Sequence, residues 1–264
     1  TKWDATTNTQ LGVTSSLCNF SEVRSVCVHV GKIFIGFGNG NIRVCRTSDY
    51  TLLTTIEVFK GGHLNAVSCM LASDGLLFAG GGNEGIIAVF DTNSYTHKMN
   101  LTGHSGMVFS LTVNDGILYS GSFDKTIKKW NCTNFKLLHT LGGVKSSVKS
   151  SVMSLTTHED KLIGGGSDGA IYIWRLKDDR HLVTIDGITA ANALCVRNDI
   201  LYAISSRGHN IYVFDVKNFR YVGSIRHPEK VSCLSMHEGK LFSAHEGGDI
   251  KVLECEKESL SAPF

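Results

Sequence analysis

Short apolar runs separated by turns of small and polar residues recur along the whole chain. The most regular run begins with isoleucine and ends on an apolar or aromatic residue, or on the aspartate that follows one. It occupies residues 42–45, 87–91, 127–130, 171–174, 211–215 and 250–253. Two apolar runs precede it and one follows it, as at residues 108–111, 117–119 and 136–141 around Trp130. Short apolar runs bounded by Gly, Ser, Asn and Asp predict β-strands.

The starts of the isoleucine runs lie 39 to 45 residues apart. A period of about 40 residues that holds four strands is the unit of a β-propeller blade. The sequence therefore predicts an all-β chain with six blades.

The unit that contains Trp130 resembles a WD40 repeat. It has the pair Gly103–His104, the turn residue Asp124 and the strand-end Trp130, with Ser120 between them. The resemblance extends with erosion over nearly the whole chain and implies a WD40-type β-propeller. It also implies a structural tetrad, in which His104, Ser120, Asp124 and Trp130 are hydrogen-bonded to one another within the blade.

The number of blades has two interpretations. The family resemblance implies that an N-terminal strand, residues 10–14, completes the last blade beside residue 251 and so removes an exposed sheet edge. That interpretation gives six closed blades. Alternatively, Trp3-Asp4 is the end of a further third strand, which would suit a seventh blade. We expect residues 1–264 to form a single propeller domain, part of a longer protein because the sequence starts at Thr1.

The composition of the chain disfavours several classes of function. The chain has 26 Lys and Arg against 24 Asp and Glu, which is too balanced to favour nucleic acid. Its eight cysteines include no CxxC pair, so we expect neither a disulfide framework nor a metal site, and no cofactor. No apolar run approaches the roughly 20 residues of a membrane span, and no secretory signal opens the sequence. We therefore expect a cytoplasmic or nuclear protein with no membrane contact.

Three motifs imitate active sites. Residues 80–85 and 164–169 fit GxGxxG, residues 165–169 fit GxSxG, and Ser120, His104 and Asp124 have the residue types of a catalytic triad. The glycine motifs need a following helix, whereas strands are predicted here. All of them fall at repeat positions, so we predict structural turns, no enzyme activity and no small-molecule substrate.

Function is therefore expected at the surface. By the family resemblance, residues beside the start of each first strand and before the turn acid reach the upper rim. Apolar side chains gather there at Met107, Phe109, Phe123 and Met153, and such groups are typical of protein interfaces. The rim set is completed by Arg24 and Arg207. A loop with Lys145 and Lys149 is a further candidate.

The prediction is a non-catalytic scaffold or adaptor that binds other proteins or peptides on this rim. Two alternatives remain. One is a substrate-recognition module of a ubiquitin ligase or a kinase-targeting module, and the other is an RNA-binding propeller.

Overall fold

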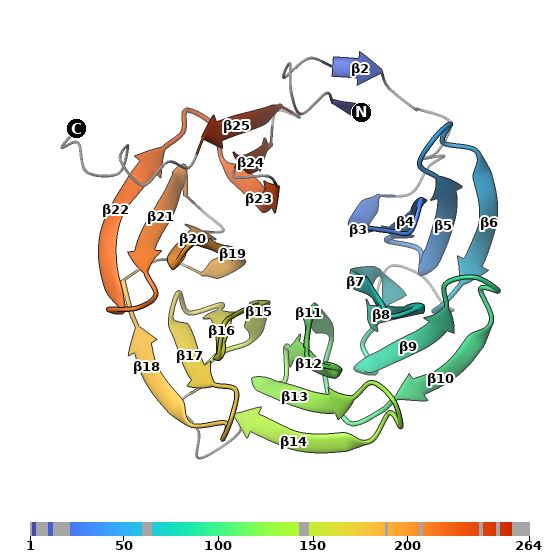
Figure 1. The fold of residues 1–264 in the computed structure, drawn as a ribbon, viewed down its shortest axis with the longest axis horizontal. Helices are drawn as coiled ribbons and strands as arrows, with labels where there is room; N and C mark the ends of the chain where they lie inside the picture. The colour runs from blue at the N-terminus through green and yellow to red at the C-terminus, as the bar shows by residue number, and fades with distance from the viewer. Residues whose placement is uncertain are drawn as a thin grey trace. The chain divides into compact units, whose positions relative to one another are not determined.

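The regular elements that this computed structural model describes are β-strands (Figure 1). The structure describes residues 2–3, 10–12, 22–59, 65–142, 148–187, 190–205, 208–237, 240–246 and 249–254. The described residues include no helix with the length and apolar character that a membrane crossing requires.

Apart from one two-stranded sheet of β1 (Lys2–Trp3) and β2 (Gln10–Gly12), the described strands form six antiparallel sheets in chain order, which confirms the six predicted blades. Blade 1 is β3 (Val23–His29), β4 (Lys32–Phe37), β5 (Asn41–Arg46) and β6 (Leu52–Glu57), and blade 2 is β7 (Val67–Ser73), β8 (Leu76–Gly81), β9 (Ile86–Asp91) and β10 (His97–Leu101). Blade 3 is β11 (Val108–Asn114), β12 (Ile117–Ser122), β13 (Thr126–Asn131) and β14 (Leu137–Gly142). Blade 4 is β15 (Val152–His158), β16 (Lys161–Gly166), β17 (Ile171–Arg175) and β18 (His181–Ile185). Blade 5 is β19 (Ala191–Arg197), β20 (Ile200–Ser205), β21 (Asn210–Asp215) and β22 (Arg220–Arg226), and blade 6 has three described strands, β23 (Val231–His237), β24 (Lys240–His245) and β25 (Ile250–Glu254).

The chain divides into two compact units. The first holds residues 1–124 with 130–136, and the second holds residues 125–129 with 137–264. The expectation of one domain stays a prediction.

Four of the five hydrophobic clusters found among the described residues lie between neighbouring blades. In the first unit, Phe34 and Val44 of blade 1 pack in one cluster with Leu77 and Phe90 of blade 2. Second strands are buried along nearly their whole length, as β12 shows. This explains why these strands are apolar at consecutive positions in the sequence.

Side chains of first strands also hydrogen-bond to the backbone of the next blade, a contact that we call the hydroxyl clasp. Ser25 Oγ donates to the Val67 carbonyl at 2.7 Å, and Ser154 Oγ donates to the Ala191 carbonyl at 2.7 Å. Glycine on the second strand makes room for this contact. A Cβ on Gly165 would lie 2.5 Å from Ser154 Oγ and 2.3 Å from the Ala191 oxygen. The glycine of the GxSxG-like motif therefore permits blade packing.

The predicted closure of the last blade by residues 10–14 is wrong for residues 10–12, and residues 13–14 lie outside the described residues. The strand β2 (Gln10–Gly12) pairs with β1 (Lys2–Trp3) in a separate two-stranded sheet. The reason is local: β2 already pairs with β1, as the fourth strand of each complete blade pairs with its third. The alternative interpretation of Trp3-Asp4 as the end of a third strand agrees with this pairing.

Candidate functional site

Blade 3 contains the hydrogen-bonded network that the family resemblance implied. His104 Nδ1 lies 2.7 Å from Asp124 Oδ2, and His104 Nε2 lies 2.8 Å from Ser120 Oγ. The indole Nε1 of Trp130 donates to Ser120 Oγ at 2.9 Å. One arrangement of protons satisfies all three contacts. His104 donates from Nδ1 to Asp124, and Ser120 donates to Nε2 while accepting from Trp130.

The network fixes two loops at one edge of the blade. Because the four strands alternate in direction, the segment that enters the first strand and the turn between the second and third lie at the same end, here called the upper edge. Asp124 also accepts from the Ser105 backbone N–H at 3.0 Å, and Ser122 Oγ donates to the Gly106 carbonyl at 2.9 Å. The Phe123 N–H donates to the Met107 carbonyl at 2.9 Å.

This frame presents a pair of aromatic rings. Phe123 is 62% exposed, although its backbone lies between two residues of the network. The ring of Phe109, at the start of β11, meets it edge to face with centroids 6.4 Å apart. Met107 and Phe109 are partly buried. Because the backbone of Phe123 is already fixed, binding a partner there costs little further conformational entropy.

The remaining rim candidates are less prominent. Met153, on β15, is partly buried. Arg24 is exposed, but its guanidinium pairs with Glu22 at 2.7 Å. Arg207 and Lys145 lie outside the described residues. Lys149 is exposed, and its backbone N–H donates to the Tyr172 hydroxyl at 3.2 Å.

The triad-like residues of blade 3 do not form an accessible catalytic site. Ser120 is fully buried, and His104 is 5% exposed. Trp130 already donates to the oxygen that would attack a substrate. The two glycine-rich motifs lead into β9 and β17 rather than into helices. A substrate could reach Ser120 only if the blade opened.

Blade 4 replaces the network with a different one. The hydroxyl of Tyr172 donates to Asp168 Oδ2 at 3.0 Å, and the Asp168 N–H lies 3.3 Å from Ser150 Oγ. Gly164 stands at the position of Ser120, and a Cβ there would lie 3.2 Å from the Trp174 ring. A side chain at this position would therefore crowd the Trp174 ring.

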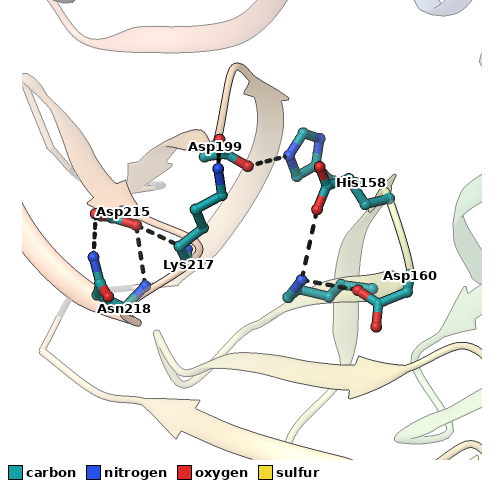
Figure 2. Close-up of polar contacts among 8 residues, drawn as sticks. His158, Asp160, Asp199, Asp215, Lys217 and Asn218 are labelled. Atoms are coloured by element: carbon teal, nitrogen blue, oxygen red, sulfur yellow. Dashed lines mark hydrogen bonds and ion pairs between the residues drawn. The ribbon is translucent and has the colours of Figure 1, made fainter.

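Sequence reasoning missed a polar cluster at the opposite edge of blades 4 and 5, which Figure 2 shows. His158 Nε2 lies 3.0 Å from Asp199 Oδ1, and Lys217 Nζ pairs with Asp199 Oδ2 at 2.7 Å. Possible ligand atoms of His158, Glu159 and Asp199 lie within 4.8 Å of one another. The signal was present, since His158 and Asp199 both lie at the turn between first and second strands of consecutive blades.

The ionisable side chains of the cluster already pair with one another or with neighbouring lysines. Lys217 and then His158 hydrogen-bond to Asp199 and lower the pKa of that carboxyl to about 2. Lys161 Nζ lies 2.9 Å from Asp160 Oδ1 and 4.0 Å from Glu159 Oε2. Because both Asp199 oxygens already have cationic or imidazole partners, a metal ion would have to displace them. We therefore interpret the cluster as an ion-pair network that joins two blades.

The comparisons with known proteins agree with this geometry. Residues 95–131, from the turn before β10 to the end of β13, match the family model "WD domain, G-beta repeat". The chain carries a WD40 repeat. A crystal structure of the WD40 repeats of RRP9 superposes with a TM-score of 0.80 at 17% identity, covering 93% of this chain and 79% of that one. The fold is therefore that of a WD40 β-propeller.

Two curated relatives of this chain are from Arabidopsis thaliana. Zinc finger CCCH domain-containing protein 62 is 29% identical over 75% of this chain and 49% of its own length. F-box/WD-40 repeat-containing protein At5g21040 is 26% identical over 71% of this chain and 38% of its own length. The chain thus spans half or less of these relatives.

Proposed function

We propose that this WD40 chain is a non-catalytic protein-interaction platform and that Phe123 is the anchor of its binding surface. WD40 propellers generally bind other proteins and are generally non-catalytic. The observation that carries the proposal is the 62% exposure of Phe123 on a backbone held by buried hydrogen bonds.

The physical reason is the balance between the apolar area that binding buries and the entropy that it costs. Covering an exposed aromatic ring removes a large apolar area from water, and aromatic residues are enriched among the dominant contacts of interfaces. The partner that fits is a peptide or domain with an apolar side chain to cover Phe123 and Phe109.

The experiment compares two substitutions of exposed aromatic residues. Partners are captured with the wild-type protein and identified, and their Kd is then measured against Phe123→Ser and Tyr221→Ser. Tyr221, on β22 of blade 5, is 55% exposed and serves as the matched control. We expect Phe123→Ser to weaken binding by about 2 kcal/mol, roughly thirtyfold in Kd, with an unchanged melting temperature. Equal affinities for both variants would contradict the proposal.

One relative favours a more specific role. The F-box protein joins an F-box to WD-40 repeats in one chain. By analogy, the surface around Phe123 would select substrates for a ubiquitin ligase. A captured partner whose ubiquitylation in cells falls with Phe123→Ser and not with Tyr221→Ser would support this role; unchanged ubiquitylation of a partner that still depends on Phe123 for binding would exclude it.

A further inference from the structure

The sheet of β1 and β2 has the pairing register of the outer half of a blade. Trp3 pairs with Gln10 and Lys2 pairs with Gly12, with an irregularity between the two pairs. In blade 5, Phe214 pairs with Tyr221 and Val213 pairs with Gly223, again with an irregularity between them. These offsets are the same as those of β1 and β2.

The same offsets recur in other blades. Third and fourth strands pair as Cys45–Leu52 and Val44–Thr54 in blade 1, Phe90–His97 and Val89–Met99 in blade 2, and Trp174–His181 and Ile173–Val183 in blade 4. Each of these pairs of strands also shows the irregularity at that point. β1 and β2 therefore pair as a third and a fourth strand of the repeat.

A second, independent observation comes from blade 1. One face of β3 is turned toward blade 2, where Ser25 bonds to Val67 and Cys27 packs against the shared core. The opposite face carries Val26 and Val28, which are 56% and 64% exposed.

The equivalent residues of the next blades are covered. Met70 and Ala72 of β7 pack against the core that blade 2 shares with blade 1. Leu111 of β11 packs against the core that includes Cys69 and Phe78 of blade 2. These positions therefore normally contact the preceding blade, whereas among the described residues the equivalent apolar face of β3 stays exposed.

We propose that the valine face of β3 and the edge of β1 together dock two further strands, the inner strands of the blade to which β1 and β2 belong. The occupant is a segment of the same natural polypeptide outside residues 1–264. Two facts favour this source. Strands follow one another in chain order within each of the six blades, and this chain spans half or less of the relatives it matches. Main-chain pairing along β1 and burial of Val26 and Val28 would supply the stability.

The test supplies the missing strands from the best repeat of this chain. Residues 105–127, which include β11 and β12, are joined directly before Thr1, so that Ile127 stands three residues before Trp3 as it does before Trp130. The control fusion has the same residues in scrambled order. Both fusions and the unfused chain carry Val28→Cys, and alkylation of that thiol is followed by tandem mass spectrometry together with hydrogen exchange of β1 and β2.

We expect the ordered fusion to slow alkylation at residue 28 by about tenfold or more and to protect the amides of β1, since reactivity and exchange follow exposure. The scrambled fusion should behave like the unfused chain. Equal alkylation and exchange in the two fusions would overturn the proposal. In the intact natural polypeptide residue 28 should be protected without any fusion, and rapid alkylation there would overturn the assignment of the strands to the same chain.

Discussion

The Nε1 of Trp130 and the Oγ of Ser120 lie 2.9 Å apart, both out of contact with water. This hydrogen bond ties the third strand of blade 3 to its second strand through side chains, in addition to the backbone ladder. Ser120 passes the connection to His104 and from there to Asp124 at the upper edge. The position of Phe123 thus depends on residues buried well inside the blade.

Replacing Asp124 with alanine should destabilise the protein. The change leaves the Nδ1–H of His104 without its acceptor in a buried site, which costs on the order of 1–3 kcal/mol. Denaturant unfolding of Asp124→Ala measures the loss, with Asp186→Ala, an exposed aspartate, as control. A free energy of unfolding equal to that of the control would mean that the network contributes nothing to stability.

Removing one clasp between blades should also be measurable. Ser154→Ala deletes the hydroxyl that donates to the Ala191 carbonyl in a buried site, at a cost of about 1–2 kcal/mol. Ser224→Ala, on the exposed side of β22, is the matched control. Calorimetry should show a lower melting temperature for Ser154→Ala alone; identical melting of both variants would contradict the stabilising role of the clasp.

Thiol chemistry should distinguish the native from the unfolded chain. The described cysteines are free, and burial raises the pKa of Cys69 to about 12. Native Cys69 should therefore resist alkylation at pH 8, whereas urea-unfolded protein reacts. Because the unfolded thiol ionises near its ordinary pKa of 9.0 and the native thiol does not, this group favours folding less as pH rises from about 9 toward 12. Rapid labelling of Cys69 in native protein would disagree with its burial.

The pKa of the Asp199 carboxyl should depend on Lys217. Its pKa is held at about 2 chiefly by Lys217, so Lys217→Met should raise the pKa toward the ordinary 3.8. A lowered carboxyl pKa favours folding above its ordinary value, and this contribution is lost as pH falls from about 4 toward 2. An NMR titration of the Asp199 side chain tests the shift. The Asp178 carboxyl, which pairs with Arg175, should titrate as before.

Much of the fold could be predicted from the sequence because its signal is repeated. Isoleucine runs such as residues 127–130 occur six times, so an error in one repeat is corrected by the others. The network of blade 3 was also predictable, since all four of its residues are present.

The features that sequence reasoning missed are not repeated from blade to blade. In blade 6, Ser243 Oγ lies 3.0 Å from His245 Nε2, and the neighbouring buried His227 Nε2 has no hydrogen-bond partner among the described residues. Nothing in the repeat pattern indicates that Ser243 lies within hydrogen-bond distance of His245 rather than of His227. The N-terminal hairpin was misjudged because one strand was considered apart from the strand it pairs with. The cluster around Asp199 joins turns of two blades, and only the fold brings them together.

The hydroxyl clasp has a consequence for mechanics. Ser25 holds the blade that follows it in the chain, and Ser154 does the same in the second unit. In a repeat array whose contacts join nearest neighbours, force applied at a terminus loads one boundary at a time. Pulled in an optical trap, the chain is expected to lengthen in steps of one blade, beginning at the ends. A protein that yields in this way can lose a terminal blade under load and still keep the surface around Phe123 intact.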